Sequence, residues 1–236
     1  PTNKLIDLKL KEVIRYRDLI FLFVKRDFIT KYKQTVLGPL WYVIQPLIST
    51  IMFAFIFGNL AKISTEGLPY LLFYYGGTMF WSYFENCFKD ASDTFTANAA
   101  LFGKVYFPRL TVPLSRIFIN MIAFFIQFCL LMCFFTYYVL IDQGVSFSFS
   151  MLFLPLIVLW LAALGIGLGL IVSAVTTKYR DIKQLVTFGV GLWMYATPIV
   201  YPLSEVPESY AWLFYLNPVS APIEFFRITF YGVGRV

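Results

Sequence analysis

Basic side chains gather near the N-terminus, where they could attract anionic groups at a membrane surface. The first 35 residues hold nine Lys or Arg against four Asp or Glu, which accounts for most of the net charge of +6. Apolar and basic side chains are interleaved over residues 12–34, a pattern that predicts a helix in the membrane interface with its cations near lipid headgroups. A solvated basic segment that only sets the orientation of the chain is the alternative. The basic side chains of this segment are Arg15, Arg17, Lys25, Arg26, Lys31 and Lys33.

Several kinds of chemistry are excluded by residues that the sequence lacks. It contains no His, which excludes catalytic triads and metal sites that depend on His. It contains no GxxxxGKS or GxxxxGKT motif, so energy from nucleotide hydrolysis would have to come from another chain. Three cysteines are too few for a disulfide scaffold, and Cys129 and Cys133 share one face of an apolar helical run, which favours packing. We therefore expect no catalytic residue, no metal, no cofactor bound by this chain and no nucleic-acid partner.

The composition is that of a membrane protein. Hydrophobic residues make up 59% of the chain and charged residues only 14%, which lies outside the usual range for a soluble domain. Residues 36–61 carry no Asp, Glu, Lys or Arg, and a bilayer takes only about 20 apolar residues in helical form. Thr35 is a candidate cap for the helix that begins here. The sequence predicts an all-α polytopic membrane protein.

Five transmembrane helices are predicted. Between the second and the third, residues 89–109 mix charges with short apolar patches, which predicts a helical segment in water at the membrane surface. After the fifth, residues 202–236 are apolar but broken by prolines into runs too short to cross, which favours re-entrant or interfacial helices. The predicted spans cover residues 36–61, 68–88, 110–141, 151–175 and 185–201.

The distribution of positive charge predicts the orientation. If the N-terminus is cytoplasmic, 16 of the 19 Lys and Arg lie on the cytoplasmic side. This is the bias that the positive-inside rule describes. The sequence therefore places the N-terminus in the cytoplasm.

Small residues predict a close helix contact in the fourth span. Gly165, Gly169 and Ser173 recur every four residues and form one stripe along that helix. Such stripes let two helices approach closely in a membrane, and this role is favoured over ligand binding here. The GIGLG run that begins at Gly165 is not a dinucleotide-binding fingerprint, because it lacks the strand, turn and acidic partner of that motif.

Aromatic residues are abundant, with 27 Phe, 16 Tyr and 5 Trp. Tyr and Trp commonly form belts at both membrane interfaces, which is the expectation for Trp41, Tyr42, Trp81 and Trp212. Their rings also stack on sugar faces while offering one hydrogen-bonding group each, which suits a path for a sugar chain. Composition leaves both roles open.

Three parts of the sequence resemble the permease subunits of type 2 ABC exporters for polysaccharides and polyol phosphates, the family that exports O-antigen, capsule and teichoic acid. They are RDFITKYKQTVLGPLWYVIQPL at Arg26–Leu47, NAALFGKVYFPRLTVPL at Asn98–Leu114, and the pair TPIVYP and YLNPVSAPIEFFR at Thr197–Pro202 and Tyr215–Arg227. The second part is the most specific, in its order Asn, Leu, Lys-Val, Phe-Pro-Arg and Pro-Leu. The matches are spread over almost the whole chain.

The resemblance implies a fold and a set of partners. Six transmembrane helices per subunit would place the sixth beyond Val236, in a homodimer that works with two copies of a separate ATP-binding subunit. ATP and Mg would bind to that partner, and this chain would be a multi-pass protein of the bacterial cytoplasmic (inner) membrane. Residues 1–35 would hold a gate helix at the cytoplasmic interface, residues 89–109 the coupling region, and residues 202–236 an extracytoplasmic re-entrant region that narrows the exit.

The resemblance also implies roles for particular side chains. Coupling to the ATP-binding subunit would involve Asn98, Leu101, Phe102, Lys104, Val105, Phe107, Pro108 and Arg109. The diphosphate of a polyprenyl carrier would be attracted by Arg15, Lys25, Arg26, Lys31 and Lys33, with orientation of the chain as the alternative role. The aromatic side chains expected to line the channel are Tyr42, Phe53, Phe57, Trp193 and Tyr195.

The expected cargo is a glycan linked to polyprenyl diphosphate, with O-antigen as the leading candidate. Capsule and teichoic acid are alternatives, and export of drugs or other lipids is another, although such relatives usually lack the Phe-Pro-Arg stretch at residues 107–109. A membrane-embedded glycosyltransferase or lipid-modifying enzyme is the hypothesis from a different class. It would need a cluster of carboxylates or His beside a cavity, and the sequence shows none. Membrane lipids are further expected contacts.

Overall fold

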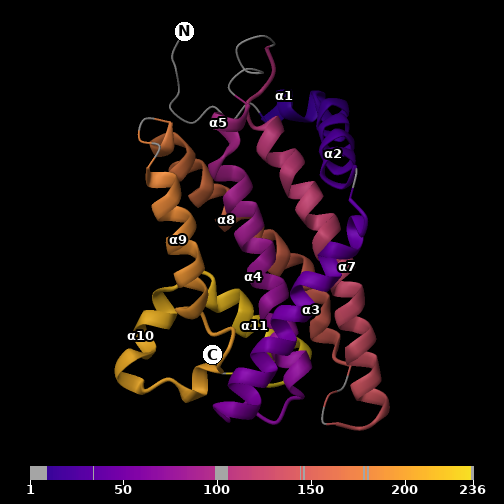
Figure 1. Cartoon of the computed structure of the whole chain (residues 1–236), viewed down its shortest axis with the longest axis vertical. Coiled ribbons are helices and arrows are strands. Elements are labelled where there is room, and N and C mark those ends of the chain that lie inside the picture. The colour runs from indigo at the N-terminus through magenta and orange to yellow at the C-terminus, as the bar shows by residue number, and fades with distance from the viewer. Residues whose placement is uncertain are drawn as a thin grey trace.

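The computed structural model describes residues 10–33, 35–98, 106–143, 145, 147–177, 179 and 181–234, and all regular secondary structure within these residues is helical (Figure 1). The predicted all-α class is therefore confirmed. The α-helices are α1 (Leu10–Arg15), α2 (Arg17–Tyr32), α3 (Trp41–Phe53), α4 (Tyr70–Ser92), α5 (Thr94–Ala97), α7 (Thr111–Leu140), α8 (Leu154–Thr176), α9 (Ile182–Tyr195), α10 (Glu208–Leu216) and α11 (Ser220–Tyr231). Short 3-10 and π segments are η1 (Gly38–Leu40), η2 (Ala54–Leu60, π), η3 (Phe149–Phe153) and η4 (Leu203–Glu205).

Three helical segments of the described residues are long and apolar enough to cross a membrane: Gly38–Leu60, Thr111–Leu140 and Phe149–Thr176. They coincide with the first, third and fourth predicted spans. The third predicted span agrees with α7 to within one residue at each end, because a long run without charges is the clearest signal of a spanning helix. The structure thus supports a polytopic membrane protein, and the number of spans stays a prediction.

The helices at the second and fifth predicted spans end at other residues than those spans, whose membrane boundaries stay a prediction. The second is predicted to end at residue 88, whereas α4 continues to Ser92 and contains Lys89 and Asp90. The fifth is predicted to reach residue 201, whereas α9 ends at Tyr195. It ends there because the chain turns before Pro198, and a proline ring disfavours the helical conformation in the residue that precedes it.

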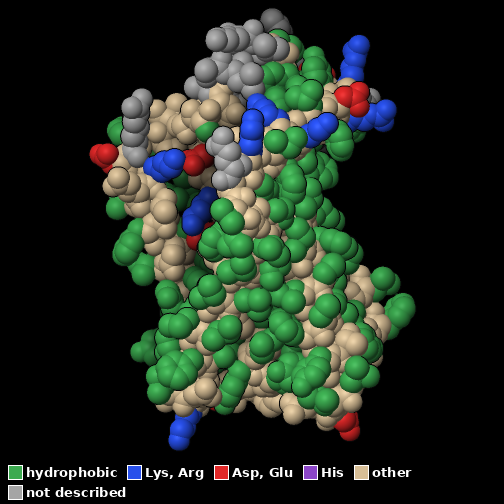
Figure 2. All heavy atoms as spheres, turned by 45° about the vertical axis from the view of Figure 1, so that its right-hand side comes forward, with side chains coloured by type: hydrophobic (Ala, Val, Ile, Leu, Met, Phe, Trp, Pro, Cys, Tyr) green, Lys and Arg blue, Asp and Glu red, His purple; other side chains and the backbone are tan. Residues whose placement is uncertain are grey.

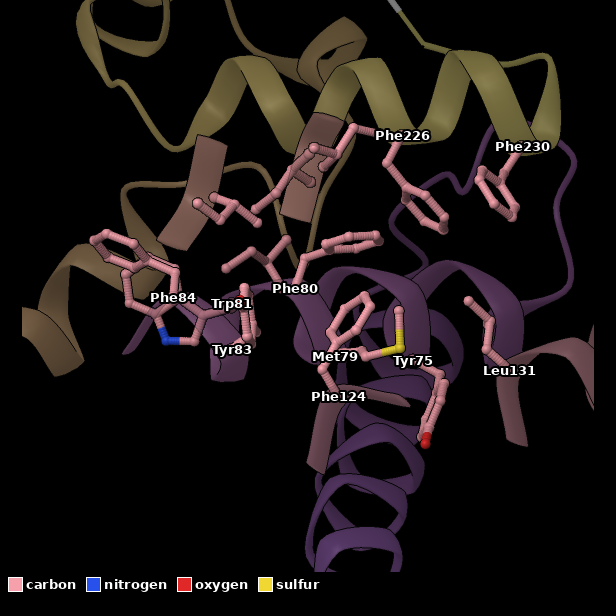
Figure 3. Packing of buried hydrophobic residues seen from close by; sticks show 14 of the residues in the cluster. Tyr75, Met79, Phe80, Trp81, Tyr83, Phe84, Phe124, Leu131, Phe226 and Phe230 are labelled. Atoms are coloured by element: carbon pink, nitrogen blue, oxygen red, sulfur yellow. The ribbon is translucent and has the colours of Figure 1, made fainter. Parts of the chain in front are cut away.

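Helix α4 lies at the centre of the structure. It packs mainly against α8 and α7, and it also contacts α3 and α9 (Figure 1). Large side chains along its middle are fully buried, among them Phe73 and Phe80. Helix α11 adds a further aromatic layer, with the ring centroids of Phe226 and Phe80 4.4 Å apart. Figure 3 shows Phe226 and Phe230 directed from α11 toward α4.

Helices α4 and α8 are in backbone contact along the predicted small-residue stripe. A Cβ atom placed on Gly165 would lie 2.9 Å from the nearest α4 atom, and one on Gly169 would lie 2.6 Å from the backbone oxygen of Phe88. Neither position has room for a side chain. Ser173 continues the stripe and accepts a hydrogen bond from the backbone N–H of Phe95 at 3.3 Å. The packing role predicted for these residues is confirmed.

Two predictions about single side chains are wrong. Thr35 does not cap the helical segment that follows, because the cap position falls two residues later, at Leu37. Its hydroxyl instead donates to Tyr32 O at 2.9 Å, at the C-terminal end of α2. Cys129 and Cys133 share one face of α7, but that face is exposed and does not pack within the chain.

Charge and apolar surface are separated along the molecule. Hydrophobic side chains cover the middle of the face shown in Figure 2. Lys and Arg side chains gather at the end that holds α1, α2 and α5, whereas the opposite end shows few charges (Figures 1 and 2). An apolar belt with one strongly basic end is the pattern expected of a membrane protein with a cytoplasmic basic side.

Candidate functional site

A cavity of about 440 Å³ lies beside the C-terminal end of α2. Its walls come from the end of α2, one face of α3 along its whole length, one face of α4, and single residues of α7 and α9. Its size is within the range of about 300–1,000 Å³ that is usual for ligand pockets. The lining combines aromatic, hydroxyl, amide and charged side chains, so it suits a polar ligand.

Helix α4 presents a polar stripe to this cavity. The stripe consists of Thr78, Trp81, Ser82, Glu85 and Asn86, whose spacing places them on one face of the helix. Trp81 is only 2% exposed, and its indole Nε1 has no hydrogen-bond partner within the described residues. Buried polar groups without a partner are uncommon because they cost free energy. This N–H is therefore a candidate donor to a ligand.

Two tyrosines and a lysine form another wall of the cavity. The Lys31 ammonium nitrogen lies 5.0 Å from the centre of the Tyr42 ring, within the range of a cation–π interaction. The rings of Tyr32 and Tyr42 meet edge to face, with centroids 5.2 Å apart. Burial raises the pKa of Tyr32 and the neighbouring Tyr42 raises it further, so the Tyr32 hydroxyl stays protonated and can donate a hydrogen bond.

Gln127 of α7 holds the α3 wall in place. Pro46 lies inside α3 and has no N–H, so the carbonyl of Tyr42, four residues earlier, lacks its usual helical partner. The buried Gln127 side chain donates from Nε2 to Tyr42 O at 2.9 Å. The Tyr75 hydroxyl of α4 donates in turn to Gln127 O at 3.2 Å. A side-chain amide thus replaces the missing backbone bond and positions Tyr42 beside Lys31.

Comparison with known proteins decides the family. The family described as ABC-2 type transporter matches residues 18–231. The chain belongs to the ABC-2 transporter family. The resemblance predicted from the sequence is therefore confirmed, and this ABC-2 chain is a membrane permease of the type 2 ABC exporter class.

Named relatives of this ABC-2 permease are transport proteins. The O-antigen export system permease protein RfbA of Klebsiella pneumoniae is 29% identical over 227 residues, which cover 95% of this chain and 85% of that protein. The RfbA protein of Myxococcus xanthus is 24% identical, over 94% of this chain and 83% of that protein. The polysialic acid transport protein KpsM of Escherichia coli is 22% identical, over 86% of this chain and 77% of that protein.

The five basic residues predicted to attract a lipid headgroup take different positions in the ABC-2 permease. Arg26 is paired, because its guanidinium lies 2.7 Å from Asp27, whose other oxygen is 3.3 Å from Arg116 of α7. Lys31 lines the cavity. The headgroup role stays a prediction. The remaining three, Arg15, Lys25 and Lys33, are exposed and lie outside the cavity lining.

The predicted coupling residues flank a gap in the described residues. Phe107 is buried and meets the Phe23 ring of α2 edge to face, with centroids 5.8 Å apart. Pro108 is also buried, whereas Arg109 is exposed. Asn98 donates from Nδ2 to a backbone carbonyl of α5 at 3.0 Å. Their contact with an ATP-binding subunit stays a prediction. The coupling residues outside the described residues are Leu101, Phe102, Lys104 and Val105.

Two of the predicted channel aromatics, Tyr42 and Phe53, line the cavity. Phe57 stands next to Phe53 with ring centroids 5.8 Å apart. Trp193 packs edge to face against aromatic rings of α4, and Tyr195 is 53% exposed. The five side chains therefore do not form one surface within a single chain, and their contact with a transported glycan stays a prediction.

Sequence reasoning missed a buried ion pair in α11. Arg227 is 1% exposed, and its Nη1 donates to Glu224 Oε1 at 2.7 Å while Nη2 donates to Ile199 O at 3.1 Å. The guanidinium carbon lies 4.0 Å from the centre of the Phe73 ring of α4. The signal in the sequence is an acidic and a basic residue three positions apart in an apolar run, a spacing that places both on one helical face. The pair ties α11 to α4 and to the turn after α9.

Proposed function

We propose that this chain is the permease subunit of an ATP-driven exporter that moves a polyprenyl-diphosphate-linked polysaccharide, with O-antigen as the leading candidate, across the bacterial cytoplasmic membrane. The names of its relatives support a polysaccharide cargo. The exporter would be a homodimer of this chain with two copies of a separate subunit that binds ATP and Mg. Its N-terminus and basic end would face the cytoplasm, as the positive-inside rule expects.

The cavity beside α2 carries this proposal. A diphosphate is bound best by cations and charge-assisted hydrogen bonds, and Lys31, the Tyr32 hydroxyl and the Trp81 N–H offer these groups. A sugar ring adds a need for flat aromatic faces, which Tyr42 supplies. All four side chains line one cavity at the start of the first apolar helix. We infer that the headgroup and the first sugars are loaded here.

The segment before α7 would transmit the movement of the ATP-binding subunit. Phe107 contacts Phe23 of α2, and Arg109, two residues later, is exposed and free to face a partner subunit. A displacement of this segment would reach α2 through the aromatic contact. Because α2 carries Lys31 to the cavity wall, ATP hydrolysis in the partner could then open or close the loading site.

Capsule export is the alternative, because one relative, KpsM of Escherichia coli, is named a polysialic acid transport protein. Its identity to this chain is 22%, against 29% for RfbA of Klebsiella pneumoniae, which ranks it second. Teichoic acid, drug or lipid export and a glycosyltransferase activity have no such support. Within the described residues no group of three or more His, Cys, Asp or Glu could hold a metal ion.

A matched pair of lysine variants tests the loading site. Lys31→Gln and Lys33→Gln each remove one positive charge at the same end of α2, but only Lys31 lines the cavity. Loss of a charged hydrogen bond costs about 1.5–3 kcal/mol, so we expect K31Q to lower the appearance of glycan at the cell surface about tenfold and K33Q to leave it nearly unchanged. Membrane insertion and co-purification of the ATP-binding subunit should persist in both. Equal export by the two variants would remove the headgroup role.

Charge reversal tests the coupling segment separately. Arg109→Glu should abolish the stimulation of ATP hydrolysis by substrate in the purified complex, because the exposed cation would be lost from the surface that faces the partner subunit. The permease should still insert in the membrane. Unchanged assembly together with unchanged stimulation would show that coupling runs through another segment.

A further inference from the structure

A second groove, of about 760 Å³, lies along α1, the N-terminal half of α2 and the first half of α7. Ile20 and Val24 of α2 form one wall, and Phe118, Ile122 and Phe125 of α7 are prominent in the other. Among the described residues, the lining contains one charged side chain, which is Arg17. The groove shares no lining residue with the cavity proposed for the glycan headgroup.

Hydrocarbon is the material that suits this groove. Its α7 wall belongs to the candidate membrane span Thr111–Leu140, so the groove lies at membrane depth. Its rim is strongly exposed within the chain: Phe21 to 72% and Phe125 to 64%. Exposed apolar surfaces of this kind mark contacts with another protein or with a membrane, and in a membrane span the surrounding lipid is always present to cover them.

The positive charge of Arg17 favours a lipid with an anionic headgroup. The Arg17 side chain is 82% exposed, and the nearest acid, Asp18, lies 3.9 Å away and is itself 97% exposed. Exposed pairs of this kind contribute little, so the guanidinium stays available to a second anion. Arginine binds phosphate oxygens in a bidentate geometry, and the surface of a membrane leaflet that contains anionic lipids attracts such side chains.

Two contacts fix the position of α2 relative to α7 and to the segment before α7. Asp27 joins α2 to Arg116 of α7 at 3.3 Å, beyond the last groove residue of α2. The Phe23 ring, which is 5% exposed, packs against Phe107. The position of α2 beside the groove is therefore held by specific contacts with α7 and with the segment before it.

We propose that this groove binds one anionic phospholipid, with an acyl chain between α2 and α7 and its phosphate on Arg17. The bound lipid fills this groove and packs against the side of α2 that faces the membrane. This inference does not depend on the proposed cargo, because it rests on a different set of residues. It predicts that the position of α2, and through it the cavity wall at Lys31, responds to the lipid composition of the leaflet at the basic end.

Retention of defined lipids by the full-length protein tests the proposal. The protein is purified from membranes, depleted of lipid in detergent and incubated with dioleoylphosphatidylglycerol or with zwitterionic dioleoylphosphatidylcholine, and the lipid that remains per protomer is measured by mass spectrometry. We expect phosphatidylglycerol to be retained in preference to phosphatidylcholine. Arg17→Gln and Ile122→Trp, which remove the cation and fill the groove, should each lower retention at least threefold, and Arg17→Lys should restore most of it.

Two matched controls make the test decisive. Arg15→Gln removes the same charge two residues away, outside the groove lining, and Leu159→Trp adds the same bulk at an exposed position of α8. Both should retain the lipid as the unmodified protein does, and gel filtration checks that all variants stay folded. The proposal fails if R17Q behaves like R15Q, if I122W behaves like L159W, or if the two phospholipids are retained equally.

Discussion

Helix α4 packs against α8 on one side and borders the polar cavity on the other, and the two sides follow different rules. Toward α8 it presents Phe84, Cys87, Phe88 and Ala91, against which the glycines of α8 leave no space for a Cβ atom. Toward the cavity it presents polar and aromatic side chains, and a volume of about 440 Å³ stays open. Both stripes repeat at helical spacing, so one helix carries a closed face and an open face.

The two sides of α4 differ in the interactions that hold their neighbours in place. Helices in lipid are held together chiefly by close packing and interhelical hydrogen bonds, since lipid is as apolar as their side chains. The α8 face provides packing through Gly165 and Gly169. The open face lacks that contact and depends on particular polar bonds, of which Gln127 to Tyr42 O is the clearest. Breaking each face should therefore have a different consequence.

The largest effect is expected on the closed face. Gly169→Leu would drive a side chain into the backbone of α4, where a Cβ atom already lies 2.6 Å from Phe88 O. Because the α4 backbone cannot easily move aside, we expect the free energy of unfolding to fall by about 3 kcal/mol, near the upper end for overpacking. The measurement is the melting temperature of the purified protein in detergent, together with the yield from membranes.

Gly167→Leu is the matched control, because no atom lies within 4 Å of a Cβ atom at that position. It makes the same chemical change two residues away on the same helix, and it should change stability by less than about 0.5 kcal/mol. Equal destabilisation by the two variants would mean that glycine itself, and not contact with α4, matters in α8.

A smaller effect is expected on the open face. Gln127→Leu leaves the Tyr42 carbonyl without its donor and should cost about 1–3 kcal/mol, the penalty for an unsatisfied buried polar group. It should also lower glycan export, because Tyr42 loses its position beside Lys31. Stability is read from thermal melting and export from the glycan at the cell surface.

Pro46→Ala provides the control for this interpretation. Alanine at position 46 restores an N–H that can donate to Tyr42 O within α3, so the cost of Gln127→Leu should shrink in a Pro46→Ala background. A double-mutant cycle measures the coupling. If the two changes are simply additive, Gln127 does not act by replacing the bond that proline removes.

The smallest effect is expected where α9 meets the end of α4. Lys183 and Asp93 form an ion pair at 2.9 Å, with side chains 57% and 39% exposed. Exposed pairs contribute about 0–1 kcal/mol, so Lys183→Gln should lower the melting temperature only slightly, and less at high salt because of screening. A large loss that persists in about 1 M salt would mean that the contact between α9 and the end of α4 is as tightly built as the α8 face.

Much of the fold could be predicted from local signals. The long apolar run that forms α7, with Arg116 near its start, and the stripe Gly165, Gly169 and Ser173 both appear in the structure as expected. Their signals are periodic and strong, since a long apolar run has few alternatives and small residues at every fourth position share one face. The basic segment likewise forms helices at the charged end of the molecule.

The composition of the cavity was not predictable in the same way. Lys31 and Tyr42 were predicted for separate roles, and only the fold places the ammonium over the ring at 5.0 Å. Gln127 is an isolated polar residue in an apolar run, and the sequence does not show that the Tyr42 carbonyl, left without a helical donor by Pro46, is its partner. The ends of α4 and α9 also escaped prediction, because they depend on neighbours and on a single proline.

The sequence by itself determined that this chain is a helical membrane protein, which end of it is basic, and which face of the fourth predicted span packs closely. Those properties follow from composition and from spacing along one helix. The tertiary structure alone decided that α4 has an open side, that Gln127 completes the backbone of α3, and that α2 and α7 enclose an apolar groove. Each of these joins residues far apart in the chain, and helical periodicity carries no information about which helices become neighbours.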